Sequence, residues 1–345
     1  MNRFENVNLL KMQTFGVEIE MSGLAPRRII EVVAARFGTT ETVKTTAYDH
    51  DGVTLVGYEC TGYDSNGNAN TWRVVHDGSI SSTGGGSGEL VTPVLHYGDI
   101  ETLQQIVRDL RVAGAHSNSS LGCGVHIHVG ADLNKEGGHT TRSLRNLSNL
   151  MASHEELLIK ACGVSASRYC RNGYTQRSDA SFIETLNRVR PTTIERFAQV
   201  WYNSHGYNVP TRAEGNHYNH SRYHMLNLHA TFLPYIGRNY NRCTCEFRLF
   251  EFHGNAMHAG ELKAYIQLCL AMSSYSKLVS RVSPEPVDLF NEKKAMKNWL
   301  DNMGLVGDEF KTCRTLLGRR LSGDTAYRNG RPVADSLDDL HLVTD

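Results

Sequence analysis

The chain has 345 residues, which is enough for one large domain or two smaller ones. Apolar residues make up 40% of it and charged residues 21%, proportions typical of a soluble globular protein. Its 36 Lys and Arg residues balance 36 Asp and Glu residues, so the composition does not indicate a nucleic-acid-binding protein.

The sequence predicts a cytoplasmic protein. Its eight cysteines form no Cys-x-x-Cys pair and no dense framework, which is typical of reduced thiols inside a cell. The first residues, Met1 to Asn6, lack the apolar core of a signal peptide. No apolar run approaches the roughly 20 residues needed to cross a bilayer, so we expect no contact with a membrane.

Apolar periodicity predicts alternating strands and helices along the chain. Residues 45–70 are rich in Gly, Asn, Asp and Tyr and are interpreted as an insertion of hairpins and turns. The polar stretch 203–222 is expected to be a loop, and the C-terminus a weakly ordered tail. In chain order the predicted strands span 14–21, 72–76, 89–93, 125–130 and 243–252, and the predicted helices span 26–37, 100–110, 141–162, 179–201, 259–280 and 290–301.

The strands are polar on one face, whereas strands of a parallel sheet covered on both sides would be continuously apolar. We therefore expect an α+β fold in which helices cover one side of an antiparallel sheet.

Ionisable side chains recur on the polar faces of these strands. Residues two apart on a strand share a face, and the intervening residues here are apolar. Gly122, Gly124 and Gly130 flank one of the strands and allow a backbone or ligand to approach closely. The pairs are Glu18 with Glu20, His126 with His128, and Glu246 with Arg248, and Glu89 begins a fourth strand.

Each of these pairs alone is typical of a solvated sheet face, but together they indicate a functional site. Several carboxylates with one or two histidines suit Mg²⁺ or Mn²⁺ bound together with phosphate oxygens. An arginine on the same surface can neutralise a phosphoryl group during transfer. Zinc is the main rival, but Cys123 falls on the opposite face from the histidines and is interpreted as a small buried apolar residue.

Other catalytic motifs are missing from the sequence. It contains no P-loop, no Gly-x-Ser-x-Gly elbow and no His-Glu-x-x-His motif. The Gly-rich stretch 84–88 fits either a flexible hairpin loop or a mobile flap near a phosphate.

The motifs and their order resemble carboxylate–amine ligases of the glutamine synthetase and glutamate–cysteine ligase superfamily, above all its amidoligase branch. The resemblance covers scattered blocks between about residues 14 and 280. The blocks are Gly16–Glu20, Asp77–Ile80, Gly88–Pro93, Gly122–Val129, Arg222–Leu228 and Glu246–Phe250.

The resemblance implies a curved antiparallel sheet, with ATP and Mg²⁺ or Mn²⁺ on its concave face and helices on its convex side. It implies a catalytic domain over 1–285, with the hairpin insertion at 45–70, and a helical extension with a tail over 286–345. It further implies metal ligation by Glu18, Glu20, Glu89, His126 and Glu246, nucleotide or substrate contacts by Arg222, Asn227, His128 and Arg248, and catalytic participation of Glu89, His128 and Arg248.

The implied reaction joins a carboxylate to an amine through an acyl phosphate formed with ATP. Two alternatives use the same site: a kinase that stops after phosphorylation, and a binding module without catalysis. The segment from Arg168 to Arg171 loosely resembles a family feature and could bind a carboxylate or be a solvated helix end. The sequence names neither the small-molecule or peptide substrates nor the oligomeric state.

Overall fold

The central sheet begins with β1 (Phe15–Ser22), in which buried apolar residues alternate with carboxylates. The computed structural model describes residues 3–40, 42–48, 54–133, 135–165, 175–210, 219–236, 243–254 and 256–327. The other strands are β2 (Thr42–Tyr48), β3 (Thr54–Tyr63), β4 (Ala69–Val75), β5 (Ser87–Val91), β6 (Val125–Gly130), β7 (Leu226–Asn227) and β8 (Thr244–Phe250).

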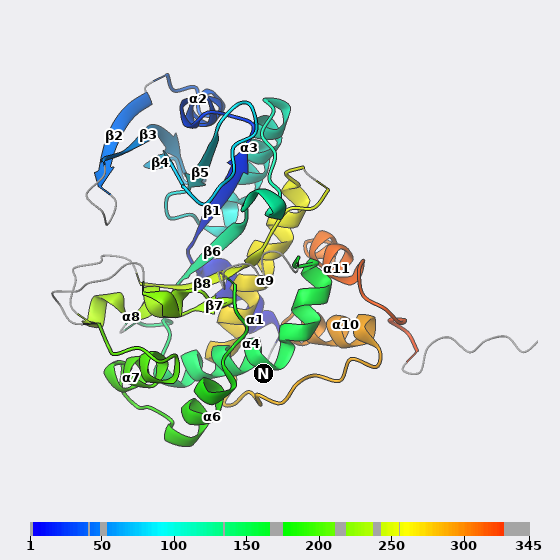
Figure 1. Cartoon of the computed structure of the whole chain (residues 1–345). Coiled ribbons are helices and arrows are strands. Elements are labelled where there is room, and N and C mark those ends of the chain that lie inside the picture. Colours follow the sequence, from blue (N-terminus) through cyan, green and yellow to red (C-terminus); the bar gives the residue numbers. More distant parts are fainter. Residues whose placement is uncertain are drawn as a thin grey trace, which may run out of the picture.

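These strands form one open sheet in the order β2-β3-β4-β5-β1-β6-β8-β7, and all their pairings are antiparallel. Strand direction turns along the sheet, so that β2 and β8 run differently in the same view (Figure 1). The predicted antiparallel sheet of an α+β fold is confirmed. Residues 45–70 fall largely in β2, β3 and β4, which extend the sheet beyond β5.

Helices cover the apolar face of the sheet. The helix α2 packs on β3, β4 and β5, and α9 packs on β6 (Figure 1). Burial of each aliphatic side chain beneath them contributes about 1.5–3 kcal/mol. The helices are α1 (Arg3–Met12), α2 (Pro26–Arg36), α3 (Ile100–Val112), α4 (Thr141–Cys162), α6 (Ala180–Val189), α7 (Ile194–Ser204), α8 (His229–Ile236), α9 (Ala259–Leu278), α10 (Glu292–Asn302) and α11 (Lys311–Gly318), and the 3₁₀ turns are η1 (Tyr97–Asp99), η2 (Ser119–Leu121) and η3 (His220–Arg222).

The first element is the helix α1, so the prediction that a strand comes first was wrong. This helix has no clear apolar stripe and depends on long-range contacts. The buried side chain of Asn6 donates a hydrogen bond of 2.6 Å to the carbonyl of Met303, and Leu10 is fully buried. Such contacts come from residues about 300 positions away and leave no local signal.

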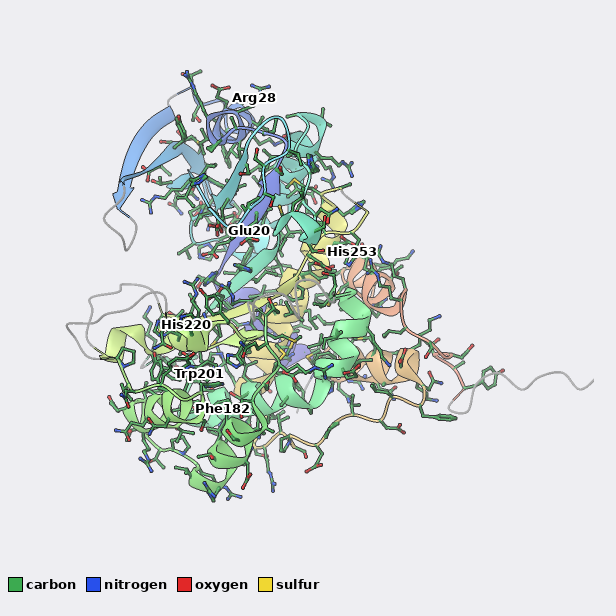
Figure 2. The ribbon with its side chains drawn as sticks, in the orientation of Figure 1. Glu20, Arg28, Phe182, Trp201, His220 and His253 are labelled. Carbon is green, nitrogen blue, oxygen red and sulfur yellow. The ribbon has the colours of Figure 1, made fainter. Side chains whose placement is uncertain are left out.

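The predicted helix over 179–201 is two helices, α6 and α7. Pro191 explains the break, because it disfavours the helical conformation of the preceding residue. Arg190 accordingly has a φ of 48° and ends α6. The packing of the two helices is visible in Figure 2, where Phe182 and Trp201 lie near one another, with ring centroids 5.0 Å apart.

The predicted tail contains a further helix, α11, which packs on α9. Its Cys313 and Leu317 are fully buried, and Arg319 just beyond it forms an ion pair with the buried Glu261 of α9. Residues 328–345, also predicted as tail, lie outside the described part of the chain. The region after α9 therefore contributes to the main core.

The contact of α10 with α4 predicts acid sensitivity. The His154 ring of α4 stacks on Trp299 of α10 at 4.1 Å between centroids, and burial lowers the pKa of His154 to about 4. The neutral ring therefore stabilises the fold above its ordinary pKa of 6.5, and this contribution is lost as the pH falls towards 4. We expect this loss to lower the free energy of unfolding by about 2 kcal/mol when the pH falls from 7.5 to 5.

Urea unfolding of the wild type and of His154→Phe at both pH values measures this contribution. The phenyl ring keeps the stacking but cannot be protonated, so the variant should lose less stability on acidification. An equal loss in both proteins would exclude the assignment to His154.

Candidate active site

The strand register brings the predicted ionisable residues together on one face. Across β1 and β5, Glu20 lies opposite Glu89, and across β1 and β6, Glu18 lies opposite His126. His128 lies opposite Glu246 across β6 and β8. Residues paired directly across antiparallel strands share a face, so four strands contribute to one surface. Figure 2 shows Glu20 near the middle of the molecule, on β1.

Glu18 is the centre of this surface. Its Oε2 lies 3.1 Å from Nδ1 of His126, and its Oε1 lies 3.2 Å from Nε2 of His128. Two trios of possible ligand atoms share it: Glu18, Glu89 and His126, and Glu18, His128 and Glu246, with all atoms of each trio within 4.8 Å of one another. The face therefore offers two adjacent positions for cations.

The pKa values of Glu18 and Glu89, two carboxylates at these positions, are shifted in opposite directions. Burial raises the pKa of Glu18, but the charges of His128 and His126 and their hydrogen bonds outweigh burial and hold it well below its ordinary value. Burial and the neighbouring charges of Glu18, Glu20 and Asp77 raise the pKa of Glu89 well above its ordinary value. Negative charge thus accumulates around Glu89, and a cation bound there would relieve this repulsion.

Glu246 and Arg248 form a buried ion pair on β8. Nη1 of Arg248 lies 2.5 Å from Oε1 of Glu246, and the residues are 6% and 2% exposed. Burial raises the pKa of Glu246, but the charges of Arg248 and His128 outweigh it and lower the pKa to about 2. A β-bulge beside these residues, where β8 pairs with β6 between Val125 and Ile127, alters the local direction of the side chains.

Arg222 also reaches this part of the site. The guanidinium carbons of Arg222 and Arg248 each lie 5.9 Å from the ring centroid of Tyr223, and the charge of Arg222 helps to lower the pKa of Glu246. Two guanidinium groups therefore meet at one tyrosine, a geometry suited to anion binding.

The ring of His128 is oriented by Thr244. Nδ1 of His128 lies 3.0 Å from Oγ1 of Thr244, which leaves Nε2 directed at Glu18 and Glu246, at 3.2 and 3.9 Å. Burial lowers the pKa of His128, but the charges of Glu18 and Glu246 outweigh it and raise the pKa. Nε2 is thus the nitrogen available to a metal ion or phosphate.

Asn227 lies beside Glu246 on β7, but it is 2% exposed and its amide is engaged within the protein. Its Nδ2 donates to Glu246 Oε2 at 2.6 Å, and its Oδ1 accepts from the backbone N–H of His229 at 2.8 Å. The contact of Asn227 with nucleotide or substrate stays a prediction. Its visible role is to hold Glu246.

Neither ligand trio contains a cysteine, which argues against zinc. Cys123 and Cys245 are fully buried, and burial raises the pKa of Cys245 to about 11. No group of possible metal ligands within the described ranges includes a cysteine. The segment from Arg168 to Arg171 lies outside those ranges.

The Gly-rich stretch 84–88 packs tightly against the end of β1. Gly23 N–H donates to the carbonyl of Gly86 at 2.9 Å, and a Cβ added to Gly85 would lie 2.1 Å from the carbonyl oxygen of Gly23. The glycines therefore permit close backbone packing. The sequence alone suggests only a flexible hairpin loop or a mobile flap near a phosphate.

Several residues of the site were not assigned from the sequence. Asp77 adds negative charge near Glu89, but the sequence marked it only as part of an Asp-Gly-Ser turn and of the block Asp77–Ile80. Thr244 orients His128 and carries no recognisable pattern, whereas Tyr223, which flanks Arg248, belongs to the block Arg222–Leu228 but was given no role.

The donor set fits a hard divalent cation. Carboxylate oxygens dominate each trio, imidazole nitrogens complete it, and thiolates do not contribute. Burial and the charges of Glu18, Glu20 and Asp77 raise the pKa of Glu89, and a cation beside it would favour its charged form.

Comparison with known proteins finds one protein family whose model matches this chain. The family model described as "Putative amidoligase enzyme" matches residues 11–273, which include the whole ionisable surface. No curated protein matches the sequence. Among solved structures, the chain is similar to a bifunctional glutathione synthetase from Pasteurella multocida, with 10% identity and a TM-score of 0.39 over 92% of this chain and 50% of that one, so it spans half the length of that protein. None of the helices described here is long and apolar enough to cross a membrane.

Proposed function

Because the chain belongs to the amidoligase family whose model matches residues 11–273, we propose that it is an ATP- and magnesium-dependent carboxylate–amine ligase. The observation that carries the proposal is the pair of ligand trios that share Glu18, next to the buried Arg248. We further propose that the sheet is the glutamine synthetase-like catalytic domain of residues 1–285, extended by 286–345.

The proposed reaction has two steps. The substrate carboxylate attacks the γ-phosphorus of ATP and forms an acyl phosphate, with ADP as the leaving group. The amine then attacks the acyl carbon, and inorganic phosphate leaves as the amide forms. The carboxylate and amine belong to small molecules or peptides.

The residues of the site divide this work. Glu18, Glu20, Glu89, His126 and Glu246 would hold Mg²⁺ or Mn²⁺. A divalent cation supplies charge stabilisation for the phosphoryl group. Arg248 and Arg222 would bind phosphate oxygens, since both guanidinium groups lie at Tyr223. His128 would contact the same oxygens through Nε2, which Thr244 directs towards the centre of the site.

The test is incubation of the protein with ATP, Mg²⁺ and pooled carboxylates and amines, followed by assays for phosphate release and for new amide masses. ADP formation that requires a carboxylate and an amine together supports the ligase. A stable phosphorylated carboxylate or guanidino compound identifies the kinase alternative instead. Absence of ATP binding by calorimetry with Mg²⁺ excludes both and leaves a binding module.

A further inference from the structure

The orientation of the Asn227 amide follows from its two partners. The backbone N–H of His229 can only donate, so it fixes Oδ1 of Asn227 at 2.8 Å. The opposite end of the amide, Nδ2, must therefore face Glu246 Oε2, which it approaches to 2.6 Å. His229 is itself held in place, because its ring Nδ1 lies 2.6 Å from the buried hydroxyl of Tyr202.

The two oxygens of Glu246 consequently have different surroundings. Oε2 accepts a hydrogen bond from Asn227, and Oε1 is the oxygen nearer to both histidines. Oε1 lies 3.8 Å from Nδ1 of His126 and 3.9 Å from Nε2 of His128, and it also receives Nη1 of Arg248. The amide of Asn227 thus holds the carboxylate of Glu246 with Oε1, rather than Oε2, towards the histidines and the candidate cation positions.

We propose that Asn227 makes the site selective for Mg²⁺ over Ca²⁺ by restricting Glu246 to coordination through Oε1 alone. Mg²⁺ takes six ligands in a strict octahedron, and one oxygen of a carboxylate satisfies one position. Ca²⁺ takes six to eight oxygens and commonly binds both oxygens of a carboxylate. A carboxylate held with one oxygen towards the cation therefore costs Ca²⁺ a ligand but leaves Mg²⁺ unaffected. This inference rests on the proposed metal binding and adds its selectivity.

Calorimetric titration of the full chain with MgCl₂ and, separately, with CaCl₂ tests the inference without relying on turnover. In Asn227→Ala the freed Oε2 can join Oε1 on Ca²⁺, while Mg²⁺ loses a well-oriented ligand. We expect Mg²⁺ affinity to fall by about tenfold, as for other residues that orient metal ligands. Ca²⁺ affinity should fall less or rise, so the ratio of the two dissociation constants shifts towards Ca²⁺.

Asn149→Ala is the matched control. Asn149 is 1% exposed and its amide is likewise engaged, with Asn187 at 2.9 Å and the carbonyl of Val282 at 3.0 Å, but it lies on α4. This variant should lose stability without a change in the ratio. A ratio unchanged in Asn227→Ala, or shifted equally in Asn149→Ala, overturns the inference.

Measurements on the wild-type protein distinguish failure of the proposed function from failure of the inferred selectivity. If it binds neither cation, the proposed function fails, whereas normal Mg²⁺ binding with an unchanged ratio in Asn227→Ala refutes only the selectivity. If Asn227→Ala does not fold, as judged by circular dichroism, a crystal structure of the wild type with Ca²⁺ decides. Coordination by Glu246 through Oε1 alone supports the inference, and coordination through both oxygens contradicts it.

Discussion

Glu18→Gln is expected to reduce ATP turnover by at least about 10³-fold, because one change removes the charge shared by both ligand trios. The amide cannot replace the carboxylate that accepts hydrogen bonds from His126 and lies beside His128. Phosphate release at saturating ATP measures turnover, and calorimetry should show weakened Mg²⁺ binding. The thermal unfolding midpoint should change little, since Glu18 lies on the partly exposed polar face.

Glu59→Gln is the control for this change. Glu59 lies on β3, in the same sheet, and is paired with the exposed Arg73 rather than with the histidines. Its replacement should leave turnover and Mg²⁺ binding near wild type. If Glu18→Gln unfolds the protein, or remains active, the assignment of Glu18 to the catalytic surface is wrong.

Arg248 is the second position at which we expect a large effect. Arg248→Ala should lower turnover by about 10³–10⁵-fold, the range for loss of an arginine that stabilises a transferring phosphoryl group. It should also destabilise the fold by about 3–5 kcal/mol, because the charge of Glu246 would remain buried without its partner.

Arg248→Lys separates the two effects. Lysine keeps the positive charge beside Glu246 but loses the planar, forked geometry that binds two phosphate oxygens. We expect a folded protein whose turnover is reduced by about 10²–10³-fold. Arg73→Lys, at an exposed arginine on β4, should have no such effect. Wild-type turnover in Arg248→Lys would contradict a direct role in phosphoryl transfer.

The polar face of the sheet could be predicted because a strand has a period of two residues. Spacing alone placed Glu18 with Glu20 and His126 with His128, and the register confirms that these strands are neighbours. Spacing could not give the distance between Glu18 and Glu246, since β6 lies between their strands. Nor could it show that residues 222–227 border Arg248 and Glu246, because that contact is set by tertiary packing.

Elements that depend on distant partners were the ones missed. The helix α1 contributes the buried Asn6 but has no strong apolar period, and α11, which contributes the buried Cys313, is only eight residues long. The resemblance implied that Asn227 contacts nucleotide or substrate. Its orientation depends on the backbone of His229 and on Glu246, and neither contact is visible in the sequence.

The position of β1 in the sheet has a consequence for biosynthesis. This strand is made first, yet it lies between β5 and β6, and β8 joins on the far side of β6. A ribosome adds about 5–20 residues per second, so the nascent strand waits about 3–14 s for β5, which ends at Val91, and longer for β6, which ends at Gly130. During that time its apolar face and both hydrogen-bonding edges are unpaired, a state prone to aggregation. Efficient production of this protein should therefore depend on chaperones that bind the N-terminal segment during translation.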